Sequence, residues 1–69
     1  MKLYKCRTIE QFKIGEWLES QGVTPDDVAF CELLARNTVK VVNPAGGYLV
    51  VHWRDGHAEI DMTKEESSA

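Results

Sequence analysis

The stretch that decides the fold is YLVVHWRDGHAEIDM, residues 48–62. At its centre, Asp55-Gly56 is typical of a two-residue hairpin turn between two runs of β-forming residues. With these two residues as the loop, the predicted cross-strand pairs are Arg54–His57, Trp53–Ala58, His52–Glu59, Val51–Ile60, Val50–Asp61 and Leu49–Met62. Opposed residues share a face, so one face is apolar and the other mostly polar. A slip of one residue would destroy this sorting, and it therefore fixes the register.

The preceding turn, residues 43–47, extends the hairpin to a three-stranded meander when Val42 pairs with Tyr48. Eight residues are then expected on the inward face: Val39, Val41, Leu49, Val51, Trp53, Ala58, Ile60 and Met62. The outward face is expected to carry Lys40, Val42, Tyr48, Val50, His52, Arg54, His57, Glu59 and Asp61. The inward residues form an apolar floor on which helices can pack.

The N-terminal half contains one clear helix. Thr8 is its expected N-cap, with Gln11 completing a capping box, and Gly22 ends it. Ile14, Trp17 and Leu18 share one face of this helix at i, i+3, i+4 spacing, and Ile9 and Phe12 fall outside that stripe. Residues 3–6 can form a short strand, and whether that strand joins the sheet is left open.

A second set of helix signals follows immediately. Thr24 is a candidate N-cap, Pro25 suits the first helical position, and Asp26 and Asp27 favour the positive end of the helix dipole. Residues 28–35 are apolar nearly all round, which fits a buried helix or a buried strand. The start signals favour the helix. We therefore expect an α+β domain over residues 1–62, ordered β-α-α-β-β-β, with two helices on one face of a three- to four-stranded antiparallel sheet and a disordered tail over residues 63–69.

Composition places limits on the class of protein. A chain of 69 residues has room for one domain, whose core is small enough that a partner subunit, metal or disulfide would help to stabilise it. Two cysteines do not make a disulfide framework, and no segment resembles a signal peptide or a membrane span. We therefore expect a cytoplasmic protein. Small acidic domains also occur among accessory proteins of phages and mobile elements, an association that no particular residue carries.

Metal binding and catalysis find little support in the sequence. Cys6, Cys31, His52 and His57 are the right residue types for zinc, but they lack zinc-site spacing, and only a weaker surface site of His52, His57 and Glu59 stays open. No motif places a nucleophile beside a base, and Gly46-Gly47 lacks the pattern of a phosphate-binding loop. We expect no enzyme activity, no cofactor and no resident metal.

Residues 17–28 resemble the core of a helix-turn-helix motif, with a turn glycine at Gly22 and Val28 placed to pack inward. The resemblance rests on few positions, and it implies a winged-helix-like nucleic-acid-binding protein. Asp26 and Asp27 would then face the phosphates and repel them. The net charge of −3 also disfavours this alternative.

The outward face of the meander is the preferred functional surface. Tyrosine and arginine are enriched at the centres of protein interfaces, and Tyr48 and Arg54 both lie on this face. The expected partner-binding residues are Tyr48, Val50, His52, Arg54, His57 and Glu59. The sequence thus predicts a small non-catalytic module that docks to another macromolecule, with a homodimer as one form of docking and no membrane partner.

Overall fold

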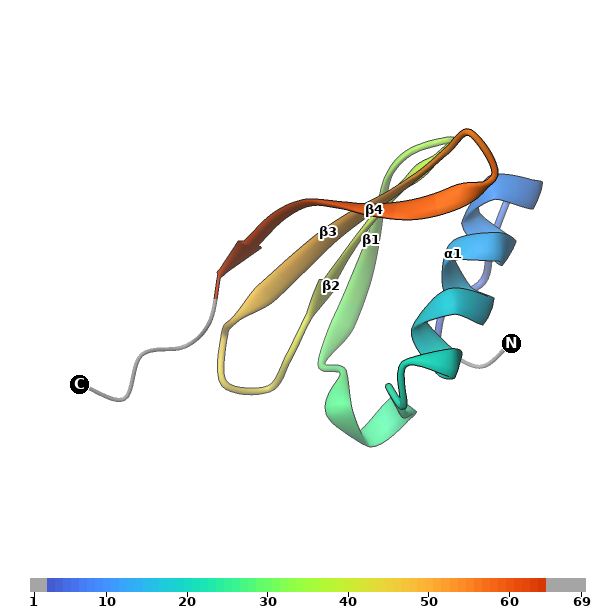
Figure 1. The fold of residues 1–69 in the computed structure, drawn as a ribbon. Helices are drawn as coiled ribbons and strands as arrows, with labels where there is room; N and C mark the ends of the chain where they lie inside the picture. The colour runs from blue at the N-terminus through green and yellow to red at the C-terminus, as the bar shows by residue number, and fades with distance from the viewer. Residues whose placement is uncertain (1–2, 65–69) are drawn as a thin grey trace.

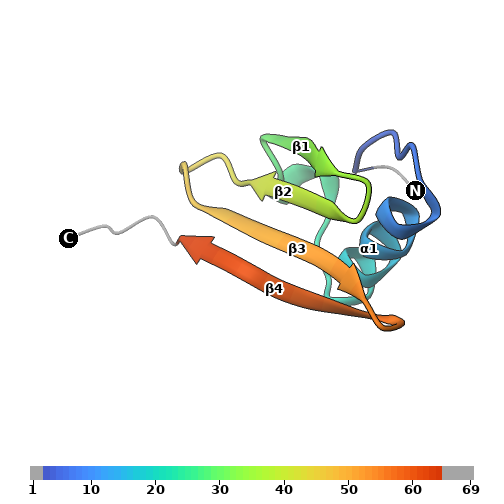
Figure 2. The same ribbon diagram turned by 90° about the horizontal axis from the view of Figure 1, so that it is seen from above.

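The computed structural model describes residues 3–64 as one helix packed on a four-stranded antiparallel sheet (Figure 1). The elements are α1 (Ile9–Ser20), the 3₁₀ turn η1 (Pro25–Asp27), β1 (Phe30–Ala35), β2 (Thr38–Val42), β3 (Tyr48–Arg54) and β4 (His57–Lys64). The strands lie side by side in sequence order, β1-β2-β3-β4 (Figure 2). The α+β class is confirmed, but there is one α-helix where two were predicted.

Helix α1 begins and ends where its sequence signals place it. The Thr8 hydroxyl caps the helix by accepting a hydrogen bond from the Gln11 N–H at 3.1 Å. Gly22 follows the helix with φ 88°, a left-handed conformation that glycine adopts without strain. Ile14 and Leu18 are fully buried, whereas Ile9 is 74% exposed. The predicted apolar stripe is therefore the face that packs on the sheet.

The second predicted helix is replaced by a short turn and a strand. The predicted N-cap does form, because the Thr24 N–H and hydroxyl both donate to Asp27 Oδ2, at 2.9 and 3.0 Å. The turn stops after three residues, and Val28 is already extended at φ −122° and ψ 124°. Residues 30–35 then pair with β2, so the open edge of β2 gives this apolar run hydrogen-bonding partners that a helix would not use. The prediction of a helix over residues 28–35 was wrong. The alternative, a strand, is correct, but β1 is an edge strand with no fully buried residue and not the buried strand that was expected.

The meander has the predicted register over most of its length. Val42 pairs with Tyr48, and Trp53 pairs with Ala58 across the Asp55-Gly56 turn. The register shifts beyond Val51, where Asp61 is left as an extra residue in β4 and Val50 pairs with Met62. The predicted pairs Val50–Asp61 and Leu49–Met62 are therefore wrong, because a β-bulge moves everything after Ile60 by one position.

Both ends of the described chain differ from the expectations. Residues 3–6 form no strand, and Leu3 and Tyr4 instead pack against the core. Burial raises the pKa of Tyr4, whose hydroxyl donates to the Gln11 carbonyl at 2.5 Å. Strand β4 continues to Lys64, two residues past the expected boundary, and residues 65–69 of the expected disordered tail lie outside the described residues.

The core lies between α1 and the middle of the sheet. Its buried members are Ile14, Leu18, Val39, Val41 and Val51. Ile60 and Met62 are 57% and 53% exposed, so the predicted apolar floor is narrower on the β4 side than expected. Within residues 3–64, no helix is both long and apolar enough to cross a membrane.

Candidate functional site: the sheet face opposite the helix

Helix α1 lies against one side of the sheet, and no helix of residues 3–64 packs on the opposite side, here called the helix-free face (Figure 1). The register places the following residues on this face: Phe30 and Glu32 from β1, Thr38, Lys40 and Val42 from β2, Tyr48, Val50, His52 and Arg54 from β3, and His57, Glu59, Met62 and Lys64 from β4. The face divides into an apolar part near the β2–β3 turn and a polar part near the β3–β4 turn.

The apolar part, here called the central patch, consists of Phe30, Val42, Tyr48, Val50 and Met62. Val42 and Val50 are only 8% and 6% exposed, although no helix covers them. Their larger neighbours shield them, because Phe30 pairs with Val42 and Met62 pairs with Val50. Phe30 and Met62 themselves stay about half exposed. The central patch is thus a packed apolar layer with two large side chains open to solvent.

Side-chain contacts run across the central patch from one strand to the next. Glu32 Oε1 lies 4.0 Å from Lys40 Nζ, which sits 4.6 Å from the centre of the Tyr48 ring. The Tyr48 hydroxyl in turn donates to Met62 Sδ at 3.5 Å. These contacts join all four strands. Glu32 balances the positive charge of Lys40, the only lysine of β2, and the Lys40 side chain lies along the sheet.

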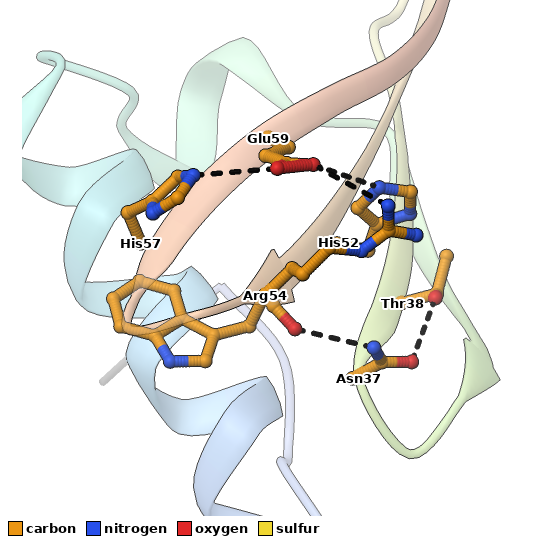
Figure 3. Close-up of polar contacts among 7 residues, drawn as sticks. Asn37, Thr38, His52, Arg54, His57 and Glu59 are labelled. Carbon is orange, nitrogen blue, oxygen red and sulfur yellow. Dashed lines mark hydrogen bonds and ion pairs between the residues drawn. The ribbon is translucent and has the colours of Figure 1, made fainter.

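The polar part, here called the polar cluster, consists of His52, Arg54, His57 and Glu59 (Figure 3). The Glu59 carboxylate is its centre. Glu59 Oε2 lies 3.6 Å from His52 Nε2 and 3.9 Å from Arg54 Nη1, and Glu59 Oε1 lies 3.3 Å from His57 Nε2. The His52 side chain is 15% exposed, whereas those of Arg54 and His57 are 59% exposed. The cluster therefore presents two exposed side chains, Arg54 and His57, beside the partly buried carboxylate of Glu59.

The turn between β3 and β4 positions the polar cluster. Asp55 and Gly56 have φ 54° and 79°, the two positive values that a tight two-residue hairpin turn requires. This turn sets Arg54 opposite His57 and His52 opposite Glu59, which brings all four side chains to one face. Asn37 makes two hydrogen bonds to Trp53 at the same end of the sheet. The Asn37 carbonyl accepts from the Trp53 N–H at 2.9 Å, and the Asn37 side chain donates to the Trp53 carbonyl at 3.2 Å.

The arrangement of the polar cluster suits recognition by hydrogen bonds and charge. Among the described residues, no group of three or more histidine, cysteine or acidic side chains is arranged to hold a metal ion, so the open surface site of His52, His57 and Glu59 is not formed. Both cysteines are free, and burial raises the pKa of the Cys31 thiol. Cys31 pairs with Val41 on the helix side of the sheet, away from both histidines.

A pocket of about 240 Å³ lies at the other end of the sheet from the polar cluster. It is lined mainly by apolar side chains, with some polar residues, and its lining residues are Val23, Asp27, Val28, Val41, Asn43, Gly47, Tyr48, Leu49, Thr63 and Lys64. Pockets that enclose drug-sized ligands usually measure 300 Å³ or more, by order of magnitude. No member of the polar cluster reaches this pocket, so the pocket and the polar groups do not form one site.

The structure brings together four of the six residues predicted for partner binding, namely His52, Arg54, His57 and Glu59. Tyr48 lies in the central patch, and Val50 forms the buried floor of that patch, so its side chain is shielded from solvent. Phe30 and Met62 were not expected on this face. Phe30 falls within the predicted second helix, and the predicted register, which contains no bulge, places Met62 on the inward face.

The helix-turn-helix resemblance fails at its second helix. The segment that would read nucleic acid is the turn η1 followed by strand β1, so there is no recognition helix within residues 3–64. No protein-family model, curated protein or solved structure matches this chain. The fold and the helix-free face are therefore the grounds for a functional proposal.

Proposed function

We propose that this protein is a small non-catalytic module that docks to another protein through the helix-free face. The observation that carries the proposal is the central patch, which keeps Phe30 and Met62 about half exposed above two buried valines. Apolar side chains gathered on an otherwise regular sheet surface are typical of interaction sites. The proposed compartment is the cytoplasm, in which Cys6 and Cys31 would stay reduced.

The chemistry of the face fits a protein partner. Aromatic residues, methionine and arginine are enriched in protein interfaces, and the face offers Phe30, Tyr48, Met62 and Arg54. The polar cluster borders the central patch, as a polar rim borders the apolar centre of an interface. Arg54 and His57 are exposed enough to reach a partner's carboxylates or carbonyl groups.

A nucleic-acid partner is less well supported by the same face. Two of its cations already have carboxylate partners, because Lys40 lies 4.0 Å from Glu32 and Arg54 lies 3.9 Å from Glu59. Proteins that bind a phosphate backbone present unneutralised lysine and arginine side chains. A catalytic role would need a nucleophile or acid–base pair beside a pocket, and the polar cluster lies on open sheet surface.

The test compares two arginine variants in capture of partners from the native host. Arg54→Ala removes a cation from the helix-free face, whereas Arg7→Ala removes an exposed cation from the segment that leads into α1. We expect Arg54→Ala and Tyr48→Ala to lose the captured protein and Arg7→Ala to retain it, with all three variants folded by circular dichroism. Retention by both Arg54→Ala and Tyr48→Ala would contradict docking through this face. Capture of nucleic acid that disappears at high salt would favour the nucleic-acid alternative.

A further inference from the structure

Strands β1 and β4 form the two outer edges of the sheet (Figure 2). Strand β4 carries features that keep an edge strand from pairing with another chain, namely a bulge at Asp61 and several charged side chains. Strand β1 has one charged residue, Glu32, and no proline or lysine, and its register is regular from Phe30 to Leu33. The edge of β1 is therefore the less protected of the two.

The hydrogen bonds of β2 show which way the backbone of β1 points. Asn43, the residue after β2, donates its N–H to the Gly47 carbonyl at 2.9 Å, on the β3 side. Backbone groups of successive residues in an antiparallel strand point alternately to its two neighbours, so those of Val42 point toward β1. In agreement, the Val42 carbonyl accepts from the Ala29 N–H, just before β1, at 2.7 Å.

The same alternation leaves four backbone groups at the outer edge of β1. Lys40, two residues before Val42, also points its backbone toward β1, where it pairs with Glu32. The N–H and C=O groups of Cys31 and Leu33, on either side of Glu32, therefore point away from β2. Within the described part of the chain, no hydrogen bond from a side chain or another segment reaches these four groups.

Neighbouring segments hold the end of β1 but leave this edge open. Helix α1 packs mainly on the other three strands, and Gln11 Nε2 donates to the carbonyl of Ala35, the last residue of β1. Residues 3–6 make no backbone hydrogen bond to β1. Unpaired backbone groups in a row at a sheet edge are a template for another extended chain, because an extended chain offers N–H and C=O groups at the same spacing.

We propose that the outer edge of β1 binds an extended segment of a partner protein, in which apolar and basic residues alternate, as a fifth strand of the sheet. This contact is separate from docking through the helix-free face and does not depend on it. Strand addition takes its affinity from main-chain hydrogen bonds and its specificity from alternate side chains. The free groups of Cys31 and Leu33 supply two donors and two acceptors for these bonds.

The charge around β1 favours basic residues in the added strand. The Glu32 side chain is 51% exposed, and within the described residues only its Oε1 has an ion-pair partner, Lys40 Nζ at 4.0 Å. A lysine of the added strand opposite Glu32 approaches it from the side away from Lys40. Asp26 and Asp27 lie just before β1, and residues 14–35 contain no lysine, arginine or histidine.

The two faces of β1 explain the alternation in the proposed segment. Glu32 and Phe30 lie on the helix-free face, where a basic side chain can pair with the carboxylate and lie over the half-exposed ring. Cys31 and Leu33 lie on the helix side and are partly buried, so the residues opposite them are best apolar. Side chains alternate between the faces of a strand, and the segment therefore alternates between the two kinds of residue.

Nuclear magnetic resonance of the isotope-labelled full chain tests the inference. The probe is a short, end-blocked peptide of alternating valine and lysine, and its matched control alternates valine and glutamate. Four hydrogen bonds and one exposed ion pair give weak binding, so we expect a dissociation constant of about 1 mM for the lysine peptide. At about 10 mM of this peptide, hydrogen exchange of the Cys31 and Leu33 amides should slow by about tenfold. The glutamate peptide should leave both amides unchanged.

Two charge reversals separate the edge of β1 from the edge of β4. Glu32→Lys and Asp61→Lys change the net charge equally, and both residues are exposed on outer strands. We expect Glu32→Lys to weaken binding of the lysine peptide by about fivefold or more and to allow binding of the glutamate peptide. Asp61→Lys should leave both affinities within about twofold of the wild type. Circular dichroism checks that both variants are folded.

Several results would overturn the inference. They are an absence of binding at about 10 mM peptide, equal effects of the two variants, and shifts on Tyr48 and Val50 in place of Cys31 and Leu33. Protection of the Cys31 amide that rises with protein concentration alone would assign the edge to a second copy and likewise overturn it. None of these results affects partner capture that depends on Arg54, so the proposed docking function stands or fails separately.

Discussion

Gln11 is the buried polar residue that joins three parts of the chain. It is 3% exposed, its Oε1 accepts from the Arg7 N–H at 2.7 Å, and its Nε2 donates to the Ala35 carbonyl at 2.9 Å. The Gln11 side chain thus hydrogen-bonds to Arg7, the residue before the N-cap, and to Ala35 at the end of β1. It does not accept from the Thr8 N–H, which is the reciprocal bond that a Thr8–Gln11 capping box would contain. The Thr8 hydroxyl adds a bond to the Arg36 carbonyl at the neighbouring turn.

Replacement of Gln11 by alanine should therefore be costly. Gln11→Ala leaves the Arg7 N–H and the Ala35 carbonyl without their partners, and we expect a loss of about 2 kcal/mol in the free energy of unfolding. Urea denaturation measures it. Glu16→Ala, on the exposed side of the same helix, should change the free energy by about 0.5 kcal/mol or less. Equal losses in the two variants would show that Gln11 contributes no more than a surface residue.

Asp27 gives the stability a dependence on acid. Hydrogen bonds from the Thr24 N–H and hydroxyl hold the pKa of this carboxyl below its usual value. A pKa that is lower in the folded chain than in the unfolded chain stabilises the fold above the unfolded value, and the contribution is lost as pH falls through the folded value. We expect the difference in urea midpoint between wild type and Asp27→Asn to shrink below about pH 4. Asp26→Asn is the control, and an equal pH dependence in both variants would contradict this assignment.

At the scale of elements, the tight turn between β3 and β4 determines the register of both strands. Gly56 has φ 79°, and a Cβ added there would meet no atom within 4 Å. Any loss of stability on substitution of Gly56 therefore comes from the left-handed backbone conformation and not from a steric clash. We expect Gly56→Ala to cost about 1 kcal/mol in unfolding free energy. Gly56→Asn should cost less, because asparagine tolerates this conformation. Similar losses in both variants would point to a steric cause instead.

The residue patterns of the strands explain why prediction from sequence succeeded for β2 and β3 and failed for β1. Asp55-Gly56 and the alternating valines specify a turn and a face at the same time, so errors in register are visible in the sequence. The run from Val28 to Ala35 would have apolar residues on both faces as a strand and nearly all round as a helix. Its hydrophobic periodicity therefore does not distinguish a strand from a helix. Thr24 and Asp27 then favoured a helix, although their hydrogen bonds support only a single turn.

The bulge at Asp61 is the reason that the candidate site was only partly predicted. Nothing in the sequence around Asp61 marks it, since a perfect alternation of Ala58, Ile60 and Met62 reads as an unbroken inward face. The structure instead leaves Ile60 on the helix side and moves Met62 to the helix-free face. The four residues of the polar cluster lie on the predicted face because all of them precede the bulge. The contribution of Phe30 and Met62 to the central patch depended on two features that local patterns do not encode.

At the scale of the whole molecule, the meander order of the strands has a consequence for how the chain folds. Each strand pairs only with its neighbours in sequence, through connections of two to five residues, and no crossover has to be closed. Contacts of such short sequence separation have a small loop-closure cost, which favours rapid folding. During synthesis, β1, β2 and β3 can pair in the order in which they leave the ribosome, whereas β3 keeps an open edge until β4 is complete. Strand β4, which is made after the other three, therefore pairs with that edge of β3 and, with Met62, completes the central patch.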